Sequence, residues 1–270
     1  MVESEMRHSS SRPIMHTVIE TKQYNKKTIV VCIGIASLLQ WLAFHLLTHA
    51  KLGLPAECFA LAQVFVVLLV SPYLAASSMS QSTASAQQLT LTSISSGKSL
   101  FFKLAISQIP LLCWVFLSTC LAVFVTDASI GKALKMLVVL GFYSFSTGAV
   151  GMWGARLLKD VIFGVELAYV LSGILIGNVF LLTPFGRYIN NIQPIIQPVL
   201  HLNPLIAVCN IFDGLDIFRN PLLYHKTPIT DYDFSYPPWY LNAFWQFTIG
   251  GCCFLWTWYM IKSNKYTSIQ

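Results

Sequence analysis

The sequence predicts an all-α polytopic membrane protein, and three observations indicate this class. Hydrophobic residues make up 55% of the 270 residues and charged residues only 10%, whereas about a quarter of the residues in a soluble domain are charged. Several apolar runs reach the roughly 20 residues that a helix needs to cross a bilayer. These runs are continuous, whereas the strands of a membrane β-barrel are shorter and alternate between apolar and polar residues.

Six apolar runs are predicted to span the membrane, at residues 28–47, 58–76, 104–125, 133–153, 161–183 and 243–261. With the N-terminus in the cytoplasm, the inner segments carry eleven Lys and Arg residues and the outer segments six. Because Lys and Arg concentrate in cytoplasmic loops, the N-terminal segment 1–27 and the tail 263–270 are both predicted to be cytoplasmic. The six-span domain 28–262 is expected in the plasma (inner) membrane. The net charge of +6 fits attraction to anionic lipid, so the bilayer, and no nucleic acid, is the predicted partner.

A polar segment of unusual composition, residues 77–103, separates the second and third predicted spans. It reads "SSMSQSTASAQQLTLTSISSGKSLFFK", contains no charge before Lys98, and favours a short helix over residues 84–91. Gly97-Lys98-Ser99 matches the end of a phosphate-binding P-loop, but that motif needs a glycine five positions earlier, where Thr92 stands. Nucleotide binding by this chain is therefore not predicted.

A second unusual segment is the predicted outer loop 184–242, which holds eight of the twelve prolines. Asn203 suits the N-cap of a short helix and Pro204 its first position. The apolar residues of one predicted face are Leu205, Val208, Cys209, Phe212 and Leu215. This helix is too short to span, so we expect it in the outer membrane interface or dipping back into it. The loop ends in the Tyr- and Trp-rich stretch "DYDFSYPPWYLNAFW", which is typical of an interfacial anchor.

The order of these parts resembles the permease subunits of type-2 ABC exporters. The cytoplasmic segment "LTLTSISSGKSLFFKL" is similar to the family's "TLELLLTSPLS" run and the Gly-Lys-Leu start of its third span, and "LNP" at 202–204 is similar to its outer helix start. The resemblance extends over residues 28–261. The family's Glu and Arg before the middle run are replaced by residues 82–85, "STAS".

The resemblance implies that segment 84–98 is a coupling helix that docks on a separate ATPase subunit. The implied coupling residues are Gln87, Gln88, Leu89, Leu91, Thr92, Ser93 and Lys98. The chain itself would not be an enzyme and would hold no cofactor, because ATP and Mg would bind the partner ATPase. A second permease subunit, identical or different, would complete an exporter that moves an amphipathic or lipid-like substrate outward.

Two other functions stay open on the residues alone. The missing charges before Gln87 favour a membrane assembly or sensor protein that binds partners without transport. An intramembrane enzyme would use Glu166 together with a histidine on the outer face. The sequence contains no catalytic or metal-binding motif that brings these residue types together.

Polar residues inside the predicted spans are candidates for a substrate path, and the residues singled out are Glu166, Gln108 and Asn178. Glu166 could instead pair with Arg156 or Lys159 near the cytoplasmic surface, and the two amides could simply bond to neighbouring helices.

Small residues four apart let helices approach closely, and they occur in the fourth and fifth predicted spans as Ser144 with Gly148, Thr147 with Gly151, and Gly173 with Gly177. They predict either a moving or dimerising interface or ordinary packing within one chain.

Overall fold

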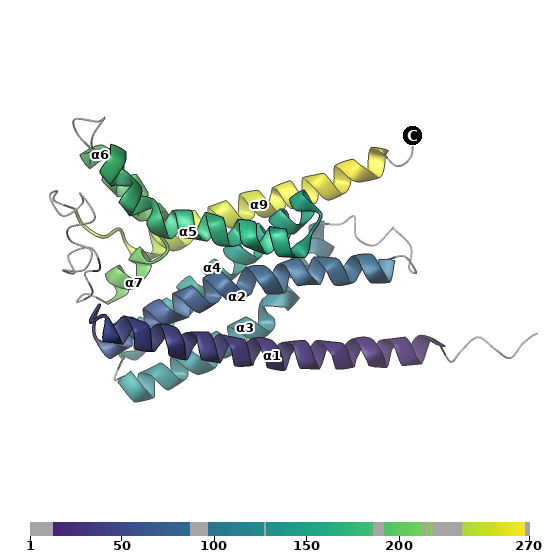
Figure 1. The fold of residues 1–270 in the computed structure, drawn as a ribbon, viewed down its shortest axis with the longest axis horizontal. Coiled ribbons are helices and arrows are strands. Elements are labelled where there is room, and N and C mark those ends of the chain that lie inside the picture. Colours follow the sequence, from purple (N-terminus) through teal and green to yellow (C-terminus); the bar gives the residue numbers. More distant parts are fainter. Residues whose placement is uncertain are drawn as a thin grey trace, which may run out of the picture.

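The computed structural model describes residues 13–86, 97–126, 128–185, 192–212, 215, 217 and 234–267, and the regular elements in these ranges are helices. The helices are α1 (Pro13–His49), α2 (Pro55–Ala86), α3 (Gly97–Thr126), α4 (Ile130–Leu158), α5 (Val161–Phe185), α6 (Gln193–Leu202), α7 (Ile206–Ile211) and α9 (Trp239–Thr267). Figure 1 shows the long helices side by side, with the short α6 and α7 at one end of the bundle.

Within the described ranges, five helices are long and apolar enough to cross a membrane. Their apolar stretches are Ile29–His49, Pro55–Met79, Gly97–Thr126, Ile130–Leu158 and Val161–Leu182. These helices coincide with five of the six predicted spans to within a few residues at most ends. The largest difference is α3, which begins at Gly97, about two turns before its predicted span. α9 contains the sixth predicted span and has 29 residues, but Asn242, Gln246 and several Trp and Tyr residues make it less apolar. The sixth span therefore stays a prediction.

The bundle has two central helices, α2 and α4. In their most apolar windows 78% and 61% of the residues are buried, against 17–28% for α1, α3 and α5. The apolar side chains that α1, α3 and α5 leave exposed, such as Leu46, Phe124 and Ile162, suit contact with lipid, because lipid tails solvate such groups. The structure is therefore consistent with a polytopic helical membrane protein.

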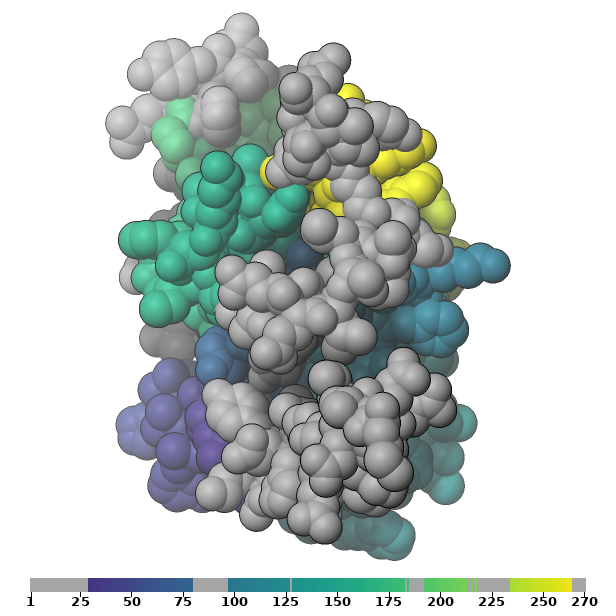
Figure 2. Space-filling view, turned by 90° about the vertical axis from the view of Figure 1, so that its right-hand side faces the viewer, coloured from purple at the N-terminus to yellow at the C-terminus, as the bar shows by residue number. Residues whose placement is uncertain are grey.

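The two ends of the bundle differ in what they hold. At one end, here called the terminal end, lie the start of α1, the end of α2, the start of α3, the α4–α5 turn and the end of α9 (Figure 1). The opposite end, here called the loop end, holds α6, α7 and the α1–α2 and α3–α4 connections. Figure 2 looks onto the terminal end, with α9 (yellow) in the upper part and α1 (purple) in the lower part.

The connections have simple local causes. Lys159 takes the left-handed conformation (φ 56°) that ends α4, as residues just after a helix commonly do. Asp160 then caps α5, because its Oδ1 accepts the N–H groups of Ile162 at 2.7 Å and Phe163 at 3.1 Å. At the loop end, Lys51 has φ 53° in the turn between α1 and α2.

The segment before α9 differs from its prediction. The sequence reasoning missed α6, whose Pro194 lies in its first turn. The short helix after it begins at Ile206, not at Pro204, and its N-cap position is Leu205. Asn203 instead accepts the Leu205 N–H at 3.0 Å with its side chain, an Asx turn that bends the chain between the two helices.

α7 is also not the one-faced helix that was expected. Val208, Cys209, Phe212 and Leu215 are buried as predicted, but so are residues on its other faces, namely Ile206, Ala207 and Ile211. A helix that is buried all round lies inside the core. α7 therefore belongs to the packed interior at the loop end.

Candidate functional site

The predicted coupling residues from Gln87 to Ser93 lie outside the described residues. The described residues on either side show that α2 runs on as a single helix to Ala86 and that α3 starts at Gly97. Lys98 is exposed in the first turn of α3. A Cβ on Gly97 would lie 3.4 Å from the Trp258 ring of α9. The start of α3 therefore packs directly on the last helix.

The three predicted path residues do not share one site. Glu166 is exposed on α5, Gln108 is buried on α3, and Asn178 is partly buried on α5 near α6. The structure places the two amides in separate polar clusters within the bundle.

The first cluster surrounds a proline and is called the kink cluster: Ser71, Pro72, Gln108, Ser144 and Gly148. Pro72 lies inside α2, where it has no N–H to donate and leaves carbonyls of the preceding turn without their usual partner. Gln108 Nε2 donates to Ser71 O at 3.3 Å. Neighbouring helices supply donors in this way to Pro-containing membrane helices.

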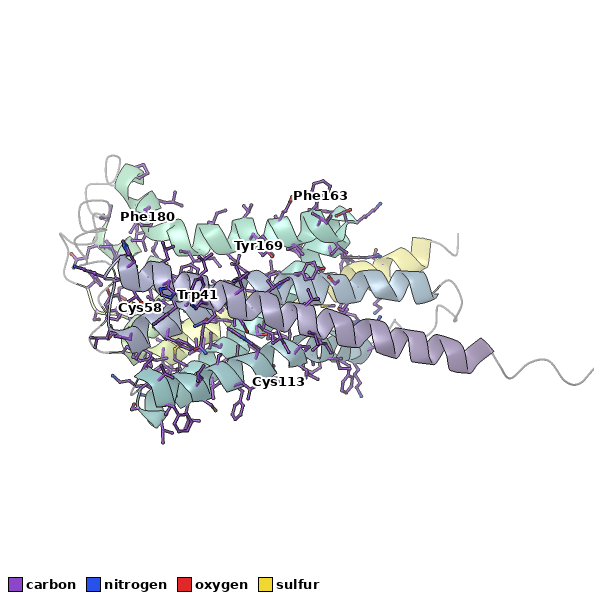
Figure 3. All side chains as sticks on the ribbon, turned by 60° about the horizontal axis from the view of Figure 1, so that its bottom comes forward. Trp41, Cys58, Cys113, Phe163, Tyr169 and Phe180 are labelled. Atoms are coloured by element: carbon purple, nitrogen blue, oxygen red, sulfur yellow. The ribbon has the colours of Figure 1, made fainter. Side chains whose placement is uncertain are left out.

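A second donor near the same kink comes from α5. Tyr169 Oη donates to Leu69 O of α2 at 2.7 Å. Figure 3 shows Tyr169 between Phe163 and Phe180 along α5, and both of these phenylalanines are exposed. Tyr169 thus turns its hydroxyl toward α2, whereas Phe163 and Phe180 of the same helix are exposed.

The kink cluster joins α2, α3 and α4 at one buried point. Ser144 Oγ donates to Gln108 Oε1 at 2.9 Å, and Ser71 Oγ donates to Ser144 O at 2.6 Å. Gly148 makes room for these groups, since a Cβ there would lie 2.8 Å from Gln108 Nε2. One turn on, a Cβ on Gly151 would lie 2.6 Å from Pro72 O. The backbones of α2 and α4 therefore touch at the kink.

The second cluster holds the turn between α6 and α7 and is called the amide clamp: Tyr143, Asn178, Asn203, Asn242 and Gln246. The last carbonyls of any helix lack intrahelical partners. Asn242 Nδ2 of α9 donates to three carbonyls of this turn, at 3.0 Å for Leu200, 3.0 Å for His201 and 3.3 Å for Asn203. Gln246 Nε2, one turn along α9, donates to Leu202 O at 2.7 Å.

α4 and α5 hold the same turn from other sides. Asn203 Nδ2 donates to Ile176 O at 2.9 Å and to Asn178 Oδ1 at 3.3 Å. Asn178 Nδ2 donates to Val199 O at 3.0 Å. The buried hydroxyl of Tyr143 donates to Pro204 O at 2.9 Å. The turn is thus fixed to α4, α5 and α9 together.

The clamp has unused hydrogen-bonding capacity. Asn242 Oδ1 and His201 Nδ1 are buried and have no hydrogen-bond partner in the described part of the chain. Buried polar atoms are usually paired. An arrangement of the clamp that gave either atom a partner would therefore gain a hydrogen bond.

The predicted small-residue pairs divide into two kinds. Gly148 and Gly151 pack within the chain against α2 and α3, whereas Gly173 and Gly177 on α5 have nothing within 4 Å of an added Cβ. The sequence reasoning missed a close backbone approach between Gly154 and Ala155 at the end of α4 and Gly164 at the start of α5. The glycines on each side of the short turn could have indicated it.

Both clusters are built from amides and hydroxyls, which bond and orient helices. The groups that sequence reasoning missed include Ser71, Asn242, Tyr143 and Tyr169. No local pattern marks a tyrosine whose hydroxyl meets a carbonyl of another helix. The chain matches no family model, no curated protein and no solved structure.

Proposed function

We propose that the chain is the membrane-spanning permease subunit of an ABC exporter, which moves an amphipathic or lipid-like substrate outward and is powered by a separate ATPase subunit. The observation that carries the proposal is the pair of short helices, α6 and α7, that packs on α9 and is held by the amide clamp. The residues of α7 are mostly buried, whereas α6 buries only Ile196 and Leu200. The exporter resemblance implies one outer helix before the last span, starting at the "LNP" of residues 202–204, and this is the place where α6 and α7 meet.

The position of the coupling segment supports the same function. Residues 87–96 connect the end of α2 to the start of α3, and both of these helix ends lie at the terminal end of the bundle. The α6–α7 pair lies at the opposite end (Figure 1). The segment that would contact the ATPase and the α6–α7 pair that would respond to its movement therefore belong to opposite ends of the bundle.

The two clusters provide a mechanical route between these ends. A displacement of α2 and α3 reaches α4 through the kink cluster, where Gln108 bonds to Ser71 and Ser144. Tyr143, next to Ser144 on α4, bonds to the α6–α7 turn at Pro204. Packed helices with alternative hydrogen-bonded arrangements switch between discrete positions. The unused Asn242 Oδ1 and His201 Nδ1 give the clamp groups for a second arrangement.

In the proposed assembly two permease subunits form the path between them, and ATP and Mg act only on the ATPase. Both termini would lie in the cytoplasm, where the ATPase docks. Gly173 and Gly177 on α5 have no atom of the described residues within 4 Å of an added Cβ. They are our proposed contact to the second permease subunit, because small residues let membrane helices pack closely.

The test is an affinity purification from detergent-solubilised native membrane, with the chain tagged at its C-terminus and its partners identified by mass spectrometry. We expect a soluble ATPase subunit to be recovered with the parent chain and lost when Leu89 and Leu91 are both changed to Asp. The matched control changes Leu157 and Leu158 to Asp, because these leucines are exposed at the same end but lie outside the coupling segment. Equal recovery of the ATPase by both double variants would contradict the coupling role.

Recovery of partners that include no ATPase, while a known exporter stays intact under the same conditions, would favour the assembly or sensor function instead.

A further inference from the structure

An open pocket of about 550 Å³ lies at the loop end of the bundle. Its walls come from three places in the chain: the α1–α2 connection with the start of α2, the α3–α4 connection, and Phe212 after α7. Pockets that bind small molecules have volumes of about 300–1,000 Å³. The function proposed above makes no use of this pocket.

A buried carboxylate lines the pocket. Glu57 is only 4% exposed. Its Oε2 accepts the Leu54 N–H at 2.7 Å, and a Cβ on Gly53 would lie 2.5 Å from the same oxygen. The glycine therefore makes room for the carboxylate, and the backbone holds it in one orientation.

The second carboxylate oxygen makes no hydrogen bond within the described residues. Because this oxygen is not among the buried atoms that lack a partner, it is accessible from the open pocket, where a carboxylate favours a cation or a hydrogen-bond donor beside it. A primary ammonium provides both, because it carries a positive charge and three N–H donors. A quaternary ammonium provides the charge without the donors.

The pocket also contains a positive charge and apolar walls. Lys132 Nζ lies 5.5 Å from the centre of the Phe212 ring, and both residues line the pocket. An ammonium has three donors, so an anion at Lys132 adds to the contacts that this residue already makes. Leu54 and Val125 are apolar wall residues that are well exposed and can continue the pocket toward lipid tails.

We propose that this pocket binds an amphipathic zwitterion, with a primary ammonium on Glu57, an anionic group on Lys132 and an apolar part along Leu54 and Val125. An aminoethyl phosphate has this chemistry, and it could come from a phosphatidylethanolamine headgroup or from free phosphoethanolamine. The inference depends on the pocket and not on the proposed transport, so it can be tested on the full chain without an ATPase.

The experiment is calorimetric titration of the purified full chain in maltoside micelles with dihexanoyl-phosphatidylethanolamine. The comparison ligands are dihexanoyl-phosphatidylcholine, which lacks N–H donors, and free phosphoethanolamine. We expect the ethanolamine lipid to bind at least tenfold more tightly than the choline lipid. Free phosphoethanolamine that binds as tightly as the lipid supports a soluble source, and weaker binding supports the lipid source. Equal binding of the two lipids would overturn the proposal.

Two variants test the two charges separately. Glu57→Gln keeps the shape and an acceptor for the Leu54 N–H, and we expect it to weaken binding of both the ethanolamine lipid and hexylammonium at least tenfold. Lys132→Gln should weaken only the lipid, because hexylammonium has no anionic group. Asp160→Asn is the matched control, since Asp160 is an exposed carboxylate between α4 and α5 outside the pocket, and it should change neither affinity.

Thermal unfolding of each variant shows that it is folded. Unchanged affinity in a folded Glu57→Gln variant would refute the site. If the Glu57→Gln variant does not fold, the Lys132→Gln variant decides. The proposal is supported if Lys132→Gln binds the ethanolamine lipid more weakly but hexylammonium equally well. It is refuted if Lys132→Gln binds the lipid as tightly as the parent chain does.

Discussion

The close packing of α4 on α5 predicts that Gly→Ala has opposite effects on stability at two positions of α5, Gly164 and Gly173. A Cβ on Gly164 would clash with the backbone N and Cα of Ala155 and would lie 2.7 Å from Gly154 C. Ordinary carbon–carbon contacts are about 3.5–4.0 Å, so the start of α5 would have to move away by about 1 Å. At Gly173 nothing lies within 4 Å of the added atom.

The expected free energies follow from these contacts. Overpacking a tight contact costs about 1–3 kcal/mol, and Gly→Ala in a helix returns about 0.5–1 kcal/mol. We therefore expect Gly164→Ala to lower the free energy of unfolding by about 1–2 kcal/mol and Gly173→Ala to raise it by about 0.5–1 kcal/mol.

The assay is equilibrium unfolding in mixed maltoside and dodecyl sulfate micelles, followed by circular dichroism. The close approach of α4 and α5 would be refuted if the Gly164→Ala variant were as stable as the Gly173→Ala variant. A dimer contact at Gly173 and Gly177 would appear separately, as a loss of dimer in the Gly173→Ala variant that depends on protein concentration.

Two further substitutions test a hydrogen bond and a helix cap with the same unfolding assay. Tyr143→Phe removes the buried hydroxyl that donates to Pro204 O and should lower the free energy of unfolding by about 1–2 kcal/mol. The control Tyr259→Phe, on the exposed face of α9, should change this free energy by less than about 0.5 kcal/mol. Equal effects of the two substitutions would argue against the clamp. Asp160→Ala removes the acceptor for two N–H groups at the start of α5 and should lower the free energy of unfolding by about 1 kcal/mol. Asp160→Asn keeps an acceptor and should retain most of that stability. An Asn variant as unstable as the Ala variant would count against capping.

Some of the buried pair contacts involve residues that the sequence singled out, but their partners were not predictable. Gln108 and Asn178 are polar residues in apolar runs, and this marks them at once. Gln108 meets Ser71 and Ser144 because α3 packs against both α2 and α4 at this level of the bundle. Asn178 meets the end of α6, a helix that the proline-rich loop concealed.

The positions of five spans could be predicted from the sequence because crossing lipid is a local requirement. A segment in hydrocarbon must satisfy its backbone within itself and present apolar side chains on most faces. A window of about 20 residues contains that information. The asymmetry of Lys and Arg likewise predicts on which side each loop lies.

The same apolarity hides which face of a span packs inward, because a helix that is apolar all round carries no period to indicate it. Ser144 with Gly148 and Gly173 with Gly177 are the same motif in sequence. Only the rotation of α4 and α5 in the bundle places the first pair against α2 and α3 and leaves the second with no atom of the described residues within 4 Å of an added Cβ. The sequence thus determined a membrane-embedded helical chain, and the tertiary packing decided which of its few polar and small residues meet.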